Sequence, residues 1–202
     1  MLISHRKEGF LDLVVGSMFS GKTEYLIDIY NKFKDEKKIF VINHNLDNRY
    51  DNNQIVSHNR NKIPVNMKTT NLSEISLNSI DNYHIFIINE GQFFPDLYEF
   101  VIQMVEQKGK IVHIAALDGD FKRNVFGEIL QLIPRCDNYL KLHALCAKCR
   151  DGTNASFSHR ISNEDKQISI GSDNYIPLCR KCYENLNILY SSNVKEEYIK
   201  KY

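Results

Sequence analysis

Short apolar runs alternate along the chain with segments in which apolar residues recur every three to four positions. A continuous apolar run is typical of a strand buried on both faces, whereas the longer period is that of an amphipathic helix. The strand-like runs lie at residues 10–15, 38–42, 85–88 and 111–117. The helical segments run from Lys22 to about Phe33, from Pro95 to Gln107 and from Asn124 to Leu132. Strands that alternate with helices predict an α/β fold with a parallel sheet and right-handed crossovers.

The remaining segments carry weaker patterns. Residues 45–62 are polar and rich in asparagine, which predicts a long loop rather than core. Residues 63–67 predict a short edge strand, and residues 72–77 predict a weak helix. After Leu145 the character of the chain changes, and the polar, cysteine-containing segment that follows is interpreted as a separate unit. Residues 191–202 hold too few apolar groups to pack.

The composition excludes several classes of protein. The 202 residues suit one medium domain with a small appendage, and 43% apolar with 25% charged residues excludes general disorder. A net charge of +1 gives no support to a strongly basic face for duplex DNA. The chain contains no run of 18 apolar residues, so no membrane span is expected. The first ten residues are too polar for a secretory signal. Five cysteines, an odd number, therefore favour a reducing compartment, and the cytoplasm is the expected location.

The most specific motif is GSMFSGKT at residues 16–23, which matches G-x-x-x-x-G-K-[ST]. In such a loop, backbone N–H groups surround phosphate oxygens, and the following helix directs its positive end at the anion. Gly21 allows close approach, Lys22 reaches the β- and γ-phosphates, and Thr23 offers a hydroxyl to Mg²⁺. The alternative is a glycine turn at the start of an ordinary helix. A strand before the motif and a helix after it favour a nucleoside triphosphate site.

Two CxxC pairs, Cys146 with Cys149 and Cys179 with Cys182, predict a structural metal site. Four thiolates complete the tetrahedral shell of Zn²⁺ and leave no open position for catalysis. Such an ion would close residues 150–178 into a loop that can cover a substrate. The alternatives are four buried cysteines, a redox pair, or a ligand from one of two histidines. The two histidines are His143 and His159. The fifth cysteine, Cys136, belongs to neither pair and is interpreted as a core or incidental residue.

An acidic residue stands directly after the most apolar strand. Glu90 is the only carboxylate in residues 89–95, at the strand end where P-loop enzymes carry an acid near Mg²⁺. A carboxylate there can take a proton from an attacking hydroxyl. The alternative is a solvated loop glutamate.

Taken together, these motifs resemble the type II thymidine kinases, the group shared by vertebrate cytosolic, bacterial and large DNA-virus enzymes. The resemblance covers Phe10 to Tyr183 in the family's order. The matching pieces are GSMFSGKT (16–23), DNRY (47–50), SHNR (57–60), INEGQFFPDLYEF (88–100), AALDGDFKRNVFGEILQLIP (115–134), CAKC (146–149) and ISIGSDNYIPLCRKC (168–182).

The resemblance implies a P-loop, RecA-like parallel sheet with flanking helices, followed by a small C-terminal zinc-ribbon domain that carries a lasso loop. The expected division is a nucleotide-binding domain at residues 1–142, a zinc-binding domain at 143–190 with its lasso over the thymidine site, and a mobile tail at 191–202. It implies that Glu90 is the catalytic base for the 5′-hydroxyl of thymidine.

The resemblance also assigns binding residues. The ATP side comprises Gly16, Ser17, Met18, Phe19, Ser20, Gly21, Lys22, Thr23, Asp47, Asn48, Arg49, Asn89 and Gln92. The thymidine side comprises Met18, Phe93, Leu117, Phe121, Phe126, Ile168, Ser169, Ile170, Gly171 and Tyr175. From the residues alone, Phe93 and Phe121 would be core aromatics. Backbone groups of 168–171 that pair with the base would reject analogues with another donor–acceptor order.

The chain departs from the family pattern at three asparagines. Asn89 replaces the usual aspartate before the glutamate, and Asn48 and Asn59 stand in the DTRY and SHD patterns. Because Asn89 lacks a charge, the expected consequence is an active enzyme with altered Mg²⁺ dependence.

The predicted function is ATP-dependent phosphorylation of thymidine, and of deoxyuridine, to the 5′-monophosphate, on a salvage route to dTTP. ATP, Mg²⁺ and structural Zn²⁺ are the expected cofactors. The resemblance further implies a homotetramer inhibited by dTTP. From the net charge and the absence of a long apolar run, neither a nucleic-acid partner nor a membrane partner is expected. Two alternatives remain: a zinc-ribbon, nucleic-acid-dependent ATPase, and a nucleotide sensor that has lost catalysis through Asn89.

Overall fold

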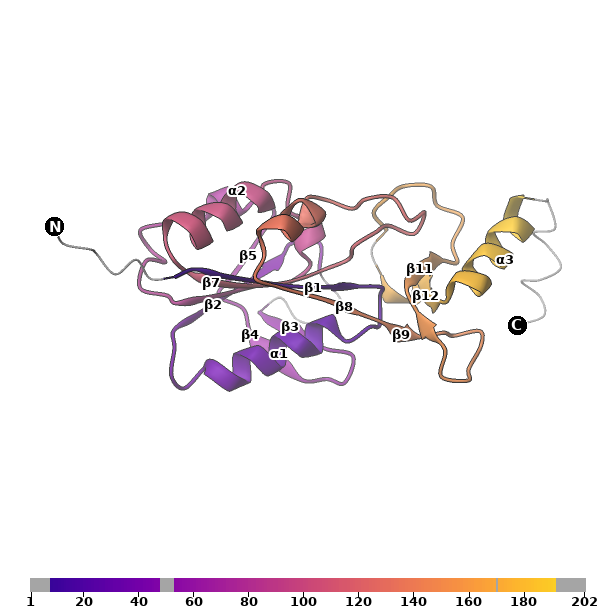
Figure 1. The fold of residues 1–202 in the computed structure, drawn as a ribbon, viewed down its shortest axis with the longest axis horizontal. Coiled ribbons are helices and arrows are strands. Elements are labelled where there is room, and N and C mark those ends of the chain that lie inside the picture. Colours follow the sequence, from indigo (N-terminus) through magenta and orange to yellow (C-terminus); the bar gives the residue numbers. More distant parts are fainter. Residues whose placement is uncertain (1–7, 48–52, 170, 192–202) are drawn as a thin grey trace.

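The computed structural model describes residues 8–47, 53–169 and 171–191 (Figure 1). Its centre is a six-stranded sheet in which every neighbouring pair of strands is parallel. In spatial order the strands are β5 (Met67–Thr69), β2 (Ile39–His44), β6 (Ile85–Ile88), β7 (Ile111–Ala116), β1 (Phe10–Gly16) and β8 (Asn138–Leu142). The four apolar runs of the sequence are β1, β2, β6 and β7, so the predicted α/β fold with a parallel sheet is confirmed.

Two hydrophobic cores cover the two faces of this sheet. Helix α1 (Lys22–Phe33) packs Leu26 and Ile27 against one face. Helix α2 (Leu97–Ile102) packs on the other face, and a π-helical turn (Gln103–Gln107) continues it. Figure 1 shows α1 and α2 on opposite sides of the sheet. Strands buried on both faces explain why their sequences are continuously apolar.

The structure corrects the prediction for residues 124–132. Instead of a helix there, a 3₁₀ helix spans Ile129–Arg135 and includes Pro134. The chain enters this segment through a turn at residues 120–124, in which the Asp120 carboxylate accepts the N–H groups of Lys122 and Asn124 at 2.8 Å. Gly127 then takes a φ of 64°, which no α-helix contains. The weak helix predicted for 72–77 is likewise only a 3₁₀ turn, Leu72–Glu74.

The predicted loop and edge strand between residues 45 and 67 also need correction. Strands β3 (Gln54–Val56) and β4 (Lys62–Pro64) form a separate antiparallel hairpin, and β5 is the edge strand of the central sheet. Each has three residues, too few for a periodicity signal. On the opposite edge, β8 has mostly exposed residues, and the sequence analysis missed it.

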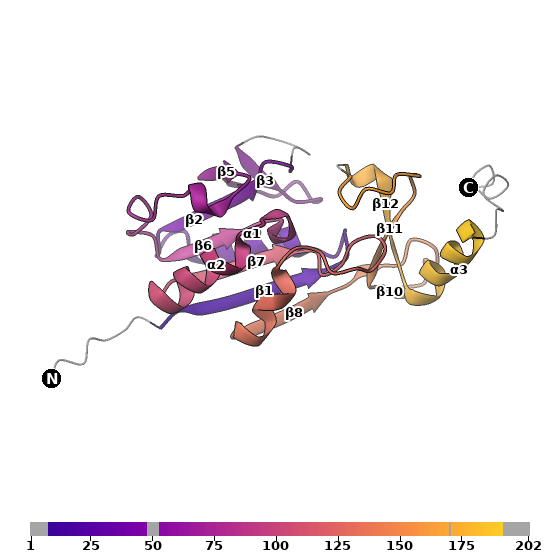
Figure 2. The ribbon, with the colours of Figure 1, turned by 90° about the horizontal axis from the view of Figure 1, so that it is seen from above.

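The cysteine-rich segment forms a small unit beyond the carboxyl ends of the central strands (Figure 2). We call residues 144–191 the cysteine module. It contains β9 (Ala144–Leu145), β10 (Asn154–Ala155), β11 (Phe157–Arg160), a 3₁₀ turn (Ser172–Asn174), β12 (Tyr175–Leu178) and α3 (Arg180–Ser191). A core of its own surrounds Ala155, Leu178 and Tyr183. None of the described helices is long and apolar enough to cross a membrane.

Candidate active site

A cavity of about 490 Å³ lies where the strands of the central sheet end. Open parallel sheets bind ligands at this edge, because the loops that follow the strands converge there. One wall is formed by residues 18–24, which follow β1, and by 46–47, which follow β2. The other walls come from residues 56–59 of the β3–β4 hairpin, from the loops after β6 and β7, and from the cysteine module. The cavity therefore joins segments that are far apart in the sequence.

The P-loop motif leaves β1 through a glycine that no other residue could replace without movement. A Cβ on Gly16, whose φ is 146°, would lie 2.2 Å from the Leu142 carbonyl oxygen of the neighbouring strand β8. Gly21, at a φ of 89°, turns the chain into α1. Lys22 Nζ donates to the Ser17 carbonyl oxygen at 2.7 Å, which draws the ammonium across the loop. The arrangement presents backbone N–H groups, a cation and a helix N-terminus to the cavity, as phosphate binding requires.

Two hydrogen bonds join the P-loop to the cysteine module. Ser17 Oγ donates to the Ala155 carbonyl oxygen at 3.0 Å, and the Met18 N–H donates to Ser158 Oγ at 2.8 Å. Ser17 and Ser158 are both buried. The sequence analysis did not find Ser158, since a lone serine in a polar segment carries no motif. Only the tertiary structure brings it to the phosphate loop.

Glu90 occupies a left-handed backbone conformation, with φ 55° and ψ 42°, at the end of β6. Few non-glycine residues adopt it, and those that do cluster at functional sites. Gln92 Nε2 donates to Glu90 Oε2 at 2.6 Å, while Gln92 Oε1 accepts the Leu117 N–H at 2.9 Å. Gln92 thus fixes the Glu90 carboxylate relative to the loop after β7. Glu90 lines the cavity and Gln92 stands behind it.

Asn89 and Asp47 meet beside Glu90. Asn89 Nδ2 donates to Asn43 Oδ1 at 3.1 Å and to Asp47 Oδ2 at 3.4 Å, and Asn43 Nδ2 donates to the same Asp47 oxygen at 3.1 Å. Two neutral amides therefore hold the Asp47 carboxylate at the cavity wall. Asn89 therefore acts here as a hydrogen-bond donor to Asp47, a role that a carboxylate could not take.

Aromatic rings form the far end of the cavity. The rings of Phe93 and Phe126 meet edge to face, with centroids 5.5 Å apart. Behind them, the buried ring of His44 lies 5.4 Å from that of Phe93. Burial lowers the pKa of His44, and the hydrogen bond to the Thr70 backbone and, less strongly, the Glu90 carboxylate partly oppose this. The phenylalanine rings therefore give this end of the cavity an apolar wall.

The structure places the predicted site residues as follows. Lining the cavity are Met18, Phe19, Ser20, Gly21, Lys22, Thr23, Asp47, Asn89, Glu90, Phe93, Leu117, Phe121, Phe126, Ile168, Ser169, Gly171 and Tyr175. Gly16, Ser17 and Gln92 are not part of the lining. Asn48, Arg49 and Ile170 lie outside the described residues, as do residues 192–202.

Several lining residues were not predicted individually. Ser57, His58 and Asn59 belong to the SHNR segment, whose match to the family pattern was the one available signal. Asp120 and Gln167 also line the cavity and bond to each other, Gln167 Nε2 donating to Asp120 Oδ2 at 3.0 Å. These two residues lie 47 positions apart, and no spacing rule connects them.

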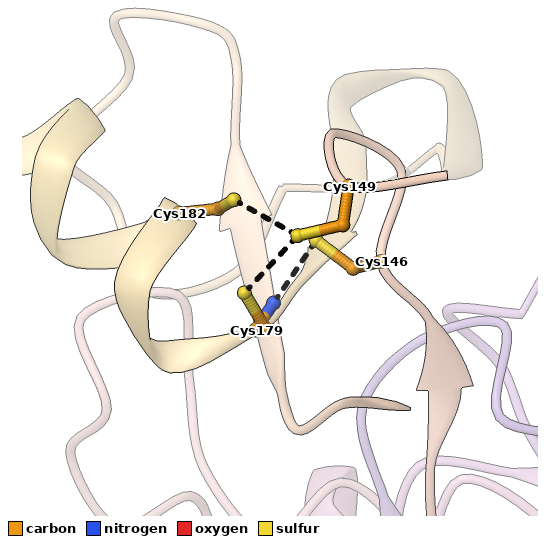
Figure 3. Close-up of side chains that lie close together, drawn as sticks. All are labelled: Cys146, Cys149, Cys179 and Cys182. Atoms are coloured by element: carbon orange, nitrogen blue, oxygen red, sulfur yellow. Dashed lines mark hydrogen bonds between the residues drawn. The ribbon is translucent and has the colours of Figure 1, made fainter. Parts of the chain in front are cut away.

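The four predicted cysteines converge (Figure 3), and their sulfur atoms all lie within 4.8 Å of one another. Cys149 Sγ is 3.5 Å from Cys182 Sγ and 3.7 Å from Cys179 Sγ. Burial raises the pKa of Cys146, but hydrogen bonds from backbone N–H groups, that of Cys179 first, outweigh it and lower the pKa to about 6. Several thiolates at these distances would repel one another, and a bound cation would offset that repulsion. The donor set and spacing fit a tetrahedral Zn²⁺ site.

The other candidate ligands lie outside this cluster. His159 is buried with its ring edge-on to Tyr183, and burial lowers its pKa to about 4. His143 Nδ1 is 3.2 Å from Ser156 Oγ. Cys136 is half-buried against the main core, and its Sγ donates to the Ile133 carbonyl oxygen at 3.1 Å. The four-cysteine interpretation is the one that the geometry favours.

Comparison with known proteins gives a consistent result. A family model described as thymidine kinase matches residues 9–183. The thymidine kinase of Amsacta moorei entomopoxvirus is 40% identical over 182 residues, which are 87% of this chain and 98% of that protein. That of Yaba monkey tumor virus is 40% identical over 183 residues, 90% of this chain and 98% of that protein. That of vaccinia virus strain Western Reserve is 41% identical over 177 residues, 87% of this chain and 97% of that protein.

Proposed function

The chain belongs to the thymidine kinase family, and from this premise we propose how its cavity phosphorylates thymidine. ATP binds at the P-loop end, thymidine binds at the aromatic end beneath the cysteine module, and the 5′-hydroxyl meets the γ-phosphate beside Glu90. The observation that carries the proposal is that Lys22, Glu90 and Phe93 line one cavity. The relatives named above do not favour a nucleic-acid-dependent ATPase or a nucleotide sensor.

At the phosphate end, the backbone N–H groups of residues 19–23 bind the ATP phosphates, and Lys22 neutralises charge on the transferring group. The Thr23 hydroxyl and the Asp47 carboxylate would hold Mg²⁺, which when bound neutralises the phosphate oxygens. Asn48 and Arg49 remain proposed members of this end from the family resemblance. The two amides beside Asp47 keep its carboxylate facing this part of the cavity.

At the nucleoside end, the base lies against the aromatic wall formed by Phe93, Phe121 and Phe126, and Met18 and Leu117 line the same cavity. Backbone groups of residues 168–171 pair with the polar edge of the base. Deoxyuridine presents the same donor–acceptor order as thymidine, so we include it as a substrate. This segment covers the base and so excludes water from the phosphoryl transfer.

Glu90 acts as the general base. Its carboxylate takes the proton of the 5′-hydroxyl as that oxygen bonds to the γ-phosphorus, the bond from phosphorus to the β–γ bridging oxygen breaks, and ADP leaves. The hydrogen bond from Gln92 orients the carboxylate relative to the cavity. Phosphoryl transfer depends mostly on positioning and electrostatics, which these residues supply.

Further proposals follow from the family. The division into a nucleotide-binding domain (1–142), a zinc-binding domain (143–190) and a tail (191–202) is retained as a proposal. So are a cytoplasmic location, a homotetramer, inhibition by dTTP and Zn²⁺ at the four cysteines. The cysteine cluster supports the last of these, because its donor set and spacing suit that ion.

Replacement of Glu90 by glutamine tests the proposed chemistry. Glu90→Gln preserves shape and removes the base, so the rate of thymidine phosphorylation should fall by about 10²–10⁴ while binding of thymidine and ATP is nearly unchanged. Steady-state assays with labelled ATP, together with titration calorimetry, measure both. Glu99→Gln, at an exposed position on α2, is the matched control and should retain wild-type activity. Retention of more than about a tenth of the rate by Glu90→Gln would assign the proton to another group.

A further inference from the structure

Arg160, at the end of β11, is a buried arginine with only 4% of its surface exposed. Its guanidinium group collects backbone carbonyl oxygens from the segment that follows. Nη1 donates to the Glu164 oxygen at 3.0 Å and also to the Lys166 oxygen, while Nη2 donates to the Gln167 oxygen at 2.9 Å. A guanidinium presents five N–H donors in a fixed plane, and lysine could not match this pattern.

The same guanidinium engages Tyr175 on β12. Arg160 Nε donates to Tyr175 Oη at 3.0 Å, and Nη2 donates to it as well. Tyr175 Oη in turn donates to the Ser169 carbonyl oxygen at 3.2 Å. A phenol has one donor and two acceptor positions, and here all three are used. In this conformation the Tyr175 hydroxyl has no hydrogen-bonding capacity left for a ligand, and only its ring can contact a nucleoside.

These contacts act directly at the cavity wall. Gln167, Ser169 and Tyr175 line the cavity, and the Arg160 guanidinium carbon lies 3.7 Å from the ring centre of Phe121, which lines it too. The segment is fastened at a second point by the bond from Gln167 to Asp120. Residues 164–169 are thus held against the nucleoside end by one arginine and one tyrosine.

We propose that Arg160 and Tyr175 are positioning residues that preform the nucleoside-covering segment. The clamp consists of the Arg160 guanidinium, the Tyr175 hydroxyl and the carbonyl groups of residues 164, 166, 167 and 169. It sets residues 164–169 before the nucleoside arrives, so that binding does not have to order them. The inference rests on the proposed function of this end of the cavity and extends it to residues that do not themselves contact the reacting atoms.

Two conservative substitutions test the clamp, Arg160→Lys and Tyr175→Phe. Each should raise KM for thymidine by about tenfold and leave kcat and the affinity for an ATP analogue within about twofold of wild type. Amide hydrogen exchange in residues 164–169 should become faster in both. The matched control is Arg123→Lys. The guanidinium carbon of Arg123 also lies over a ring of the cysteine module, 4.7 Å from the Tyr183 ring centre. Arg123 is exposed, however, and pairs with the Glu184 side chain.

The outcomes are distinguishable. Unchanged exchange in residues 164–169, or faster exchange with an unchanged KM for thymidine, would overturn the proposal. A parallel fall in kcat and ATP affinity would overturn it as well, since it would mean a general structural role. If Arg160→Lys does not fold, Tyr175→Phe removes a single oxygen atom and provides the same readouts. If the wild-type protein did not phosphorylate thymidine, the proposed function would fail, while the exchange measurement would still test the clamp.

Discussion

The two ends of the cavity are built in different ways. The phosphate end comes mainly from one contiguous stretch, residues 16–24, in which a strand, a glycine-bounded loop and a helix follow each other directly. The nucleoside end is assembled from the loops after β6 and β7 and from the cysteine module, and long-range hydrogen bonds such as Gln167 to Asp120 connect it. Disruption of the cysteine module should therefore lower the affinity for ATP far less than the affinity for thymidine. Ser17 and Ser158 are where the two ends meet.

Loss of the proposed Zn²⁺ from the cysteine cluster should separate the two ends most strongly. In Cys179→Ser, or after chelation, residues 150–178 lose an anchor at one end, and thymidine affinity should fall by about a hundredfold while ATP affinity changes much less. Titration calorimetry with each ligand measures the difference. Cys136→Ser, which changes the one cysteine outside the cluster, should behave as wild type. Equal loss of both affinities would indicate global unfolding.

The amount of bound zinc belongs to the same prediction. Elemental analysis of the purified protein should give one zinc per chain, because the four sulfur atoms already lie within 4.8 Å of one another. Less than about half a zinc per chain would contradict the site.

The hydrogen bond between Met18 and Ser158 links the cysteine module to the phosphate end. Its loss should lower the affinity for ATP, by less than loss of the metal lowers the affinity for thymidine. Ser158→Ala leaves the partly buried Met18 N–H without its acceptor, which costs about 1–2 kcal/mol and should weaken binding of a non-hydrolysable ATP analogue by roughly tenfold. Ser158→Thr, which keeps the oxygen, should restore binding. Ser156→Ala, two positions away and outside the cavity lining, is the control. An unchanged ATP-analogue affinity in Ser158→Ala would show that the two ends are independent.

Substitution of Asn89 should produce the smallest effect, confined to the phosphate end. Asn89→Asp adds a charge near the proposed Mg²⁺ position and should lower the Mg²⁺ concentration for half-maximal rate by something like fivefold, about 1 kcal/mol. The new carboxylate also faces Asp47 instead of donating to it, so without Mg²⁺ the free energy of unfolding should fall by about 1–3 kcal/mol. Denaturant titrations with and without Mg²⁺ check the second effect.

The control for this substitution is Asn45→Asp, which adds the same charge to a nearby exposed position outside the cavity lining. Its Mg²⁺ titration should match that of wild type. If the titrations of Asn89→Asp and wild type superimpose, Asn89 is not near the metal.

The same contrast explains what the sequence could predict. The strands β1, β2, β6 and β7 are buried on both faces, and their apolar runs predicted them. The P-loop and the CxxC pairs were found because fixed spacings carry their chemistry. Strand β8 was missed because an edge strand keeps exposed residues, and Gly127 broke a helix that spacing alone favoured. Ser158 and Arg160 act through contacts made only after folding, and a single serine or arginine in a polar stretch has no recognisable pattern.

The central claim is that the aromatic end of this cavity accepts thymidine and presents its 5′-hydroxyl to ATP. The most direct measurement is phosphate transfer from ATP to thymidine, deoxyuridine, deoxycytidine, deoxyadenosine and deoxyguanosine, with ADP and each 5′-monophosphate quantified. We predict one ADP per thymidine 5′-monophosphate, activity with deoxyuridine, and at least about a hundredfold lower kcat/KM for the other three nucleosides. ADP production without nucleoside phosphorylation, or equal use of all five nucleosides, would contradict the account.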